Sequence, residues 1–370
     1  MPDTTLQLRR PRSFNGSYLE TACLLDAACP GFINRVFYAS HLRRAAIFSA
    51  LAEIKFDGVM DVASRLRPLA PALCYLDLDI WAQAARALLV LRAREIVQAI
   101  HGSVPDGYLG LLARTGGDPL PRGVYRLAHD LYADPQHRAR AKLLRQMPGR
   151  ISADMIETAA RLHPVLLHQK VLHRVHAAGE VEPLHAALAL VRALVPRASD
   201  EALHRSLDGL RQSDKDLARW TECWLRRATH MPFAPPIPAN DPDLRVLNGI
   251  EMVKLGRRFR NCAADRVGHV AAGLRCYLEW VGDGGPAVIE LRRLTGGHFL
   301  VEDLRAPRNC DLNSELAARI RERLSAFGVL SPISVPPTIA GSAFLNLLGV
   351  WSGEEGEADP FLTELLEVAA

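Results

Sequence analysis

The sequence has few aromatic residues and no long apolar segment. Phe, Trp and Tyr make up 6% of the 370 residues, whereas alanine, leucine and arginine are abundant, a composition that favours helices over strands. No run of 18 apolar residues is present, and Arg86 interrupts the densest apolar stretch, residues 84–91, so the sequence predicts no membrane-spanning helix. Residues 1–12 lack an apolar core and a cleavage site, and we therefore expect no secretory signal there.

The sequence also lacks the motifs that anchor common cofactor and disulfide chemistry. Its seven cysteines are odd in number and have no repeating spacing, which predicts a reduced protein in the cytoplasm. It contains no P-loop, no Gly-x-Ser-x-Gly motif, and no Gly-x-Gly-x-x-Gly motif that opens a helix after a strand. We therefore expect neither a bound cofactor nor a metal ion.

Charge is distributed unevenly along the chain. Residues 331–370 contain no lysine or arginine and six acidic residues, a net charge of −6. Because the whole chain carries +4, the first 330 residues carry +10. A basic body with an acidic tail is compatible with a polyanionic partner, with pairing of the tail and the body, or with a solvated surface and a solubilising tail.

Residues 1–231 are predicted to form an irregular array of short helices. Asp77 or Asp79 is a candidate N-cap for a helix that runs to residue 101 and ends before Gly102, and Ser152 is a candidate N-cap for a later helix. No motif recurs at a fixed period, so the sequence excludes a strict tetratricopeptide or ankyrin solenoid.

The second part of the chain differs from the first in composition and in predicted secondary structure. Five prolines between residues 231 and 242 predict an extended linker over residues 232–242, because proline cannot continue a helix. Residues 243–330 predict a small α+β domain, and residues 331–370 predict a Pro-rich and acidic tail. The predicted fold class is therefore mainly α: an irregular helical array, followed by a small α+β domain with a three-stranded antiparallel meander.

The small α+β domain is predicted from turn and capping signals. Glycine-rich turns separate the three apolar runs that form the meander, and Asn313 is a candidate N-cap for a last helix with an apolar stripe. Its expected elements are a helix over 244–255, a short helix over 262–273, and strands over 276–281, 287–294 and 298–304.

Several features of residues 247–327 occur together. Cys262 follows a glycine and basic residues, Gly273 stands about ten residues later, the predicted strands read PAVIELRR and HFLVEDL, and Asn313 precedes the last helix. With these features the segment resembles the PcfJ-like proteins, a family that is associated with conjugative plasmids and other mobile elements and has no established activity. The resemblance implies a bacterial mobile-element or defence-type setting.

Cys262 and His269 are weak candidates for catalysis. Arg258 and Arg260 would favour the thiolate of Cys262, and His269 could act as its base. However, seven residues along one helix separate the two side chains by about 10 Å, so a direct dyad requires a break in the helix. We therefore expect Cys262 to be a buried core cysteine. A zinc site is chemically possible but lacks the usual ligand spacing. Its four ligands would be Cys262, His269, His298 and Cys310.

Histidines are frequent in the helical region. His173 and His176 lie at i, i+3, but no metalloprotease motif accompanies them. The dipeptide His129-Asp130 is similar to the His-Asp pair of helical metal-dependent phosphohydrolases. His101 and Asp154 complete such a set by their order along the chain.

Basic residues cluster before Cys262 and at the end of the second predicted strand. They are candidate phosphate contacts, although few aromatic residues are available to stack on bases. The candidate nucleic-acid-binding residues are Lys254, Arg257, Arg258, Arg260, Arg292 and Arg293. We therefore expect a non-enzymatic interaction or adaptor protein of a bacterial mobile-element or defence-type system, with a protein partner, with nucleic acid or a nucleoprotein, and without membrane contact. The alternative is a hydrolase that uses Cys262 and His269 or the helical His-Asp set.

Overall fold

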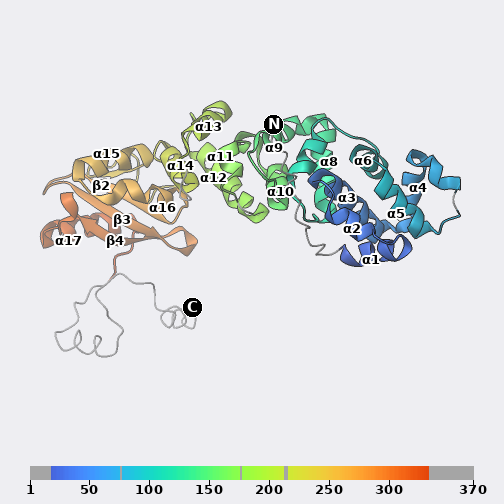
Figure 1. Ribbon diagram of the computed structural model, residues 1–370. Coiled ribbons are helices and arrows are strands. Elements are labelled where there is room, and N and C mark those ends of the chain that lie inside the picture. The colour runs from blue at the N-terminus through green and yellow to red at the C-terminus, as the bar shows by residue number, and fades with distance from the viewer. Residues whose placement is uncertain (1–17, 76, 176, 212–215, 333–370) are drawn as a thin grey trace, which may run out of the picture. The chain divides into compact units, whose positions relative to one another are not determined.

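The chain forms two compact units that interleave along the sequence (Figure 1). The computed structural model describes residues 18–75, 77–175, 177–211 and 216–332. The helical unit contains the described residues up to Phe233 together with Asn248–Gly256 and Cys262–Ala272. The sheet unit contains Ala234–Leu247, Arg257–Asn261 and the described residues from Gly273 onward. In the described part of the chain, no helix is long and apolar enough to cross a membrane.

The first part of the helical unit packs around helix α3. Residues 44–54 of α3 are all buried, and this helix contacts α1, α2, α4, α6, α7 and α8. Its elements are α1 (Leu19–Ala28), α2 (Phe32–Phe37), α3 (His41–Asp57), α4 (Val59–Leu66), α5 (Ile80–Val90), α6 (Ala93–His101), α7 (Tyr108–Arg114) and α8 (Arg122–Ala133).

The second part of the helical unit is a run of short helices in which each contacts others close to it in the chain. Helix α8 contacts α9 and α10, α10 contacts α11, and α12 contacts α14, so the predicted irregular helical array is confirmed. The elements are α9 (Arg138–Gln146), α10 (Ala153–Arg161), α11 (Gln169–Leu172), α12 (Val181–Leu194), α13 (Asp200–Ser206), the 3-10 helix η6 (Leu207–Gly209) and α14 (Asp216–Leu225).

Capping side chains set several helix boundaries. The Ser152 hydroxyl accepts a hydrogen bond from a backbone N–H and begins α10, as predicted. Asp79 caps α5 in the same way, but the prediction of one helix from Asp79 to residue 101 is wrong. Leu91 and Arg92 are extended, and the Arg92 N–H donates to Glu95 Oε2 at 2.6 Å, so a new helix, α6, begins there.

Basic side chains of one helix commonly cap the C-terminus of another. Arg43 donates to the last carbonyls of α5, Arg65 to that of Ile100 in α6, and Arg114 and Arg140 donate to carbonyls at the ends of α9 and α10. These carbonyls have no partner within their own helix, and the helix dipole favours a positive charge beside them. Several arginines of this unit therefore connect one helix to another.

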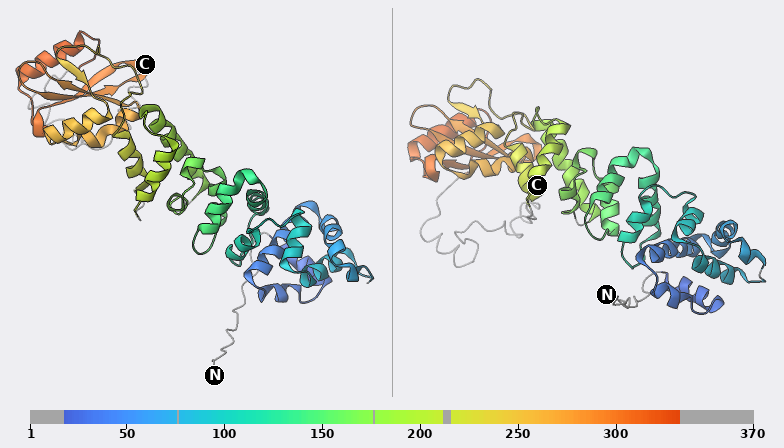
Figure 2. Two further views of the ribbon diagram at one scale, coloured as in Figure 1. Left: turned by 90° about the horizontal axis from the view of Figure 1, so that it is seen from above. Right: turned by 45° about the horizontal axis from the view of Figure 1, so that its top comes forward.

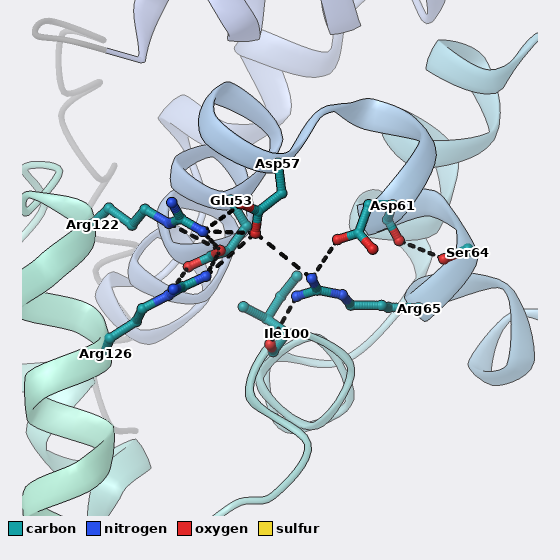
Figure 3. Close-up of polar contacts among 8 residues, drawn as sticks. All are labelled: Glu53, Asp57, Asp61, Ser64, Arg65, Ile100, Arg122 and Arg126. Carbon is teal, nitrogen blue, oxygen red and sulfur yellow. Dashed lines mark hydrogen bonds and ion pairs between the residues drawn. The ribbon is translucent and has the colours of Figure 1, made fainter.

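A buried carboxylate joins α3 to α8 (Figure 3). Glu53 on α3 is 1% exposed and accepts hydrogen bonds from Arg122 and Arg126 of α8 at 2.5–3.1 Å. Asp57, one turn further along α3, pairs with both of these arginines and lies 3.6 Å from Arg65 of α4. The network therefore holds three helices by charge-assisted hydrogen bonds.

The sheet unit contains a four-stranded antiparallel sheet (gold to orange in Figures 1 and 2). Its strands are β1 (Leu244–Val246), β2 (Arg275–Trp280), β3 (Ala287–Arg293) and β4 (Phe299–Arg305), in the order β1-β2-β3-β4. Strands β2, β3 and β4 confirm the predicted meander. Gly284 and Gly285, and then Gly296 and Gly297, have positive φ at its two turns, a conformation that glycine adopts without strain.

Strand β1 corrects the prediction of a helix over residues 244–255. Leu244 pairs with Trp280 of β2, and the helix α15 (Gly249–Phe259) begins only later. A reciprocal capping box sets this start, because the Asn248 N–H donates to Glu251 Oε2 and the Glu251 N–H donates to Asn248 Oδ1. The strand pairing and the capping box therefore determine where the helix begins, although the apolar pattern already starts at residue 244.

The last helix lies beside the sheet. Helix α17 (Ser314–Ser325) is capped by Asn313, as predicted, and buries Leu316, Ile320 and Leu324 (Figures 1 and 2). The buried carboxylate of Asp241 accepts from Arg323 at 2.6 Å.

Asp241 belongs to the proline-rich segment 232–242 that was predicted as a linker. Ile237 in this segment is also buried, so part of the segment packs into the sheet unit. The division between the units after Phe233 falls inside the segment, whereas parts of the predicted domain 243–330 belong to the helical unit. Residues 333–370, most of the predicted tail, lie outside the described residues.

Candidate anion-binding sites

The predicted basic residues at the end of α15 are exposed. Lys254, Arg257 and Arg258 lie on this helix at i, i+3 and i+4, and Arg260 follows it with a left-handed φ of 54°. Arg258 forms an ion pair with the buried carboxylate of Glu279 on β2. Among the described residues, Lys254, Arg257 and Arg260 have no carboxylate within ion-pair distance.

The two predicted residues on β3 are both exposed. Arg292 donates to both oxygens of Glu302 on β4 at 2.7 and 2.5 Å. The hydrogen bond to Glu302 raises the pKa of Arg292, and the same bond lowers the pKa of Glu302. Arg275 of β2 pairs with Glu290 and lies 3.6 Å from Glu302. The charge of Arg292 is therefore largely compensated within the sheet.

Cys262 and His269 are placed on two separate helical segments. Cys262 begins the 3-10 helix η7 (Cys262–Arg266), and His269 lies in α16 (Val267–Ala271), so the predicted single helix over 262–273 is wrong. The expectation of a buried Cys262 is also wrong, because this side chain is exposed. Cys276 on β2 is the buried cysteine of this region, and burial raises the pKa of its thiol to about 12.

The clustered histidines make specific hydrogen bonds in the helical array. The Nδ1 atoms of His163 and His168 each accept a backbone N–H two residues later, as N-caps of short helices. The His163 N–H donates to His185 Nε2 at 3.0 Å. Burial, followed by the charge of Arg192, lowers the pKa of His163, which keeps its accepting nitrogen free of a proton. His173 is exposed, and residue 176 lies outside the described residues.

The fold brings together two histidines of the proposed His-Asp set. The rings of His101 and His129 stack with centroids 4.8 Å apart, and Tyr108 contacts both rings edge-on. His101 Nε2 lies 2.9 Å from the Ser49 hydroxyl, and His129 Nε2 lies 3.0 Å from that of Ser103. Burial, and next the neighbouring His129, lower the pKa of His101 to about 4. The Nε2 atoms of both histidines thus take part in a partly buried hydrogen-bonded cluster.

The described residues contain no group of three or more His, Cys, Asp or Glu side chains that could hold a metal ion. Asp130 Oδ1 lies 3.5 Å from His129 Nδ1, and Asp154 is exposed in the first turn of α10. The described residues thus provide no geometric support for a helical metal hydrolase.

A pocket of about 440 Å³ involves none of the predicted site residues. It lies between α14 and the end of α13 with residues 209–211, within the helical unit, and its lining includes Arg219, Trp220, Trp224 and Arg227. The sequence analysis missed it. The available signal was the spacing of Trp220 and Trp224 at i, i+4 with an arginine before the first and after the second, which places these residues on one side of a helix.

Comparison of the chain with protein-family models, with curated proteins and with solved structures gave no match.

Proposed function

We propose that this protein is a non-enzymatic interaction protein that engages nucleic acid, alone or within a nucleoprotein partner. The observation that carries the proposal is the set of exposed cations at the end of α15, Lys254, Arg257 and Arg260, which have no carboxylate partner among the described residues. Unpaired, exposed cations neutralise phosphates without first breaking an internal ion pair, and they release counterions when they do so.

The charge distribution supports the same proposal. The first 330 residues carry +10, whereas residues 331–370 carry −6. An acidic tail competes with a nucleic acid for a basic surface, so its removal is expected to tighten binding. The cytoplasmic, mobile-element or defence-type setting of this proposal rests on the resemblance of residues 247–327 to PcfJ-like proteins.

Filter binding of duplex DNA at several salt concentrations tests the proposal. Reversing all three charges with Lys254→Glu, Arg257→Glu and Arg260→Glu is expected to reduce the slope of log affinity against log salt by about 0.9 for each lost phosphate contact. Deleting residues 352–370 is expected to tighten binding.

A matched control separates local contacts from overall charge. Three arginines of the helical unit are exposed and make no ion pair among the described residues, and their reversal changes the net charge by the same amount. They are Arg94, Arg161 and Arg197. Equal losses in the two triple variants would refute nucleic-acid binding at α15. No DNA retention by either the full-length or the shortened protein at low salt would refute nucleic-acid binding altogether and leave a protein-only adaptor.

A further inference from the structure

The pocket at α14 has a rigid aromatic wall. Trp220 and Trp224 are 7% and 6% exposed, and both indole N–H groups donate to the Ser206 hydroxyl, at 2.8 and 3.0 Å. The Ser206 hydroxyl itself donates to the Leu203 carbonyl at 2.6 Å. Because a hydroxyl has one donor and two acceptor sites, this arrangement uses all of them. The two tryptophans therefore keep their orientation when the pocket is empty, and the cost of ordering them on binding is small.

The rim of the pocket is cationic. Arg211, Arg219 and Arg227 line it, all three are exposed, and within the described ranges none has a carboxylate within ion-pair distance. The Arg227 guanidinium lies over the Trp224 ring, 4.8 Å from the ring centroid. This cation–π contact holds the guanidinium beside the aromatic wall.

The acidic residue among the described residues that line the pocket does not cancel this charge. Asp216 is 4% exposed and forms an ion pair with Arg174 at 3.4 Å, so its charge is already compensated inside the helical unit. The pocket thus combines three available guanidinium groups with two indole rings, in a part of the protein where many other arginines cap helices or pair with carboxylates.

We propose that this pocket binds a nucleoside phosphate. Guanidinium groups bind phosphate oxygens through pairs of parallel hydrogen bonds. Three guanidinium groups can compensate the charge of a phosphate dianion and are more than a single carboxylate ligand would need. Only small parts of the two indole rings are exposed, but the exposed lining of the pocket is more apolar than polar, which suits the edge of a planar base. The volume of about 440 Å³ is in the range of small-ligand sites. The ligand is either a free nucleotide or one nucleotide of a single strand. Both present a base and a phosphate, which is a monoester dianion in the free nucleotide and a diester monoanion in the strand.

Isothermal titration of the full-length protein tests the proposal with four probes. These are AMP, adenosine, inorganic phosphate and a ten-residue oligothymidylate, and tryptophan fluorescence provides a second readout. AMP is expected to bind at least about 10-fold more tightly than adenosine or phosphate, because only AMP uses both the cations and the wall. Tight binding of the oligonucleotide without AMP binding would assign the site to single strands if that binding is lost in the pocket variants described below and kept in the Lys254→Glu, Arg257→Glu and Arg260→Glu triple variant. Absence of binding by both, or phosphate binding as tight as that of AMP, would overturn the proposal.

Variants locate the binding at the pocket. Arg219→Gln and Arg227→Gln are each expected to weaken AMP or oligonucleotide binding by about 10- to 100-fold. Arg226→Gln is the matched control: it removes an arginine of the same region that pairs with Asp265 at 2.9 Å and does not line the pocket. Unchanged binding in both pocket variants contradicts the assignment. AMP binding does not depend on Lys254, Arg257 or Arg260, so this outcome is independent of the duplex-DNA assay.

Discussion

Replacing the buried glutamate of α3 should destabilise the helical unit by an amount that follows from its pKa. Burial alone would raise the pKa of Glu53, but hydrogen bonds from Arg126 and Arg122 outweigh it and lower the pKa from 4.5 to about 2. A tenfold change in proton affinity corresponds to ~1.36 kcal/mol, so the folded protein favours the carboxylate by about 3 kcal/mol. We expect Glu53→Gln to lower the free energy of unfolding at pH 7 by about this amount, because the amide has the same size but no charge.

The effect should depend on pH in a defined direction. The pKa of Glu53 is lower in the folded than in the unfolded protein, so its stabilising contribution is present above pH 4.5 and is lost as the pH falls towards 2. The difference between the natural protein and Glu53→Gln should therefore be constant from pH 6 to 8 and shrink below pH 4.5. The charge of Glu53 also raises the pKa of His101, so the same comparison is made in a His101→Gln background, where this coupling is absent.

Urea unfolding followed by far-UV circular dichroism measures the difference, and hydrogen exchange of α3 and α8 locates it. Glu182→Gln is the matched control, because Glu182 on α12 is exposed and makes no ion pair in the described part of the chain, and its replacement should change stability by less than about 0.5 kcal/mol. A loss below 1 kcal/mol for Glu53→Gln, or a difference that persists undiminished near pH 2.5, would refute the reasoning.

Four further predictions follow from single contacts. The pKa of His101 is about 4 when folded, below its value of 6.5 when unfolded, so stability should fall by up to about 3 kcal/mol as the pH decreases from 6.5 to 4, and His101→Gln should flatten this part of a pH titration of thermal unfolding. Arg140→Met removes three hydrogen bonds to the C-terminus of α10 and should cost about 1–3 kcal/mol in urea unfolding, with faster hydrogen exchange in that helix. Gly249→Ala should destabilise by at least about 1 kcal/mol in the same assay, because its Cβ would lie 2.3 Å from the last carbonyl oxygen of α14. Cys262 should react quickly with iodoacetamide and Cys276 only on unfolding, as peptide mass spectrometry reports, and Cys262→Ser should change stability by less than about 0.5 kcal/mol.

Local signals predicted the secondary structure where capping or turn chemistry decides it. Ser152 and Asn313 begin their helices as expected, and the glycines near residues 284 and 296 turn the meander. The start of β1 at Leu244 could not be predicted in this way, since a three-residue strand exists only because β2 is present to pair with it. The Asn248–Glu251 capping box, in contrast, is a signal within the sequence that would have predicted the true start of α15, but the prediction of a helix from residue 244 did not use it.

The sequence predicted which residue types belong to the candidate sites, but not which partners those residues contact in the fold. Residue type placed Arg258 and Arg260 in one basic cluster, yet Arg258 pairs with Glu279, which is 21 residues away, and Arg260 has no carboxylate partner in the described ranges. Likewise, the expected burial of Cys262 followed from the rule that free cysteines are usually buried. In the structure Cys262 is exposed, and Cys276 on β2 is buried instead. Such outcomes depend on contacts between segments that are distant in the sequence.

Helix α14 and the residues that follow it show why the number of arginines is a weak guide to anion binding. Arg226 and Arg227 are adjacent in the sequence, but Arg226 pairs with Asp265, whereas Arg227 lies over Trp224 at the pocket. An arginine that already has a carboxylate or a row of carbonyls must lose those bonds before it binds a phosphate, and this loss offsets much of the gain. A net charge of +10 over 330 residues therefore overstates the cations that are available to a partner. The available ones are those without internal partners. Three of them lie together at the end of α15 and three at the tryptophan pocket, and these are the places where we expect an anion to bind.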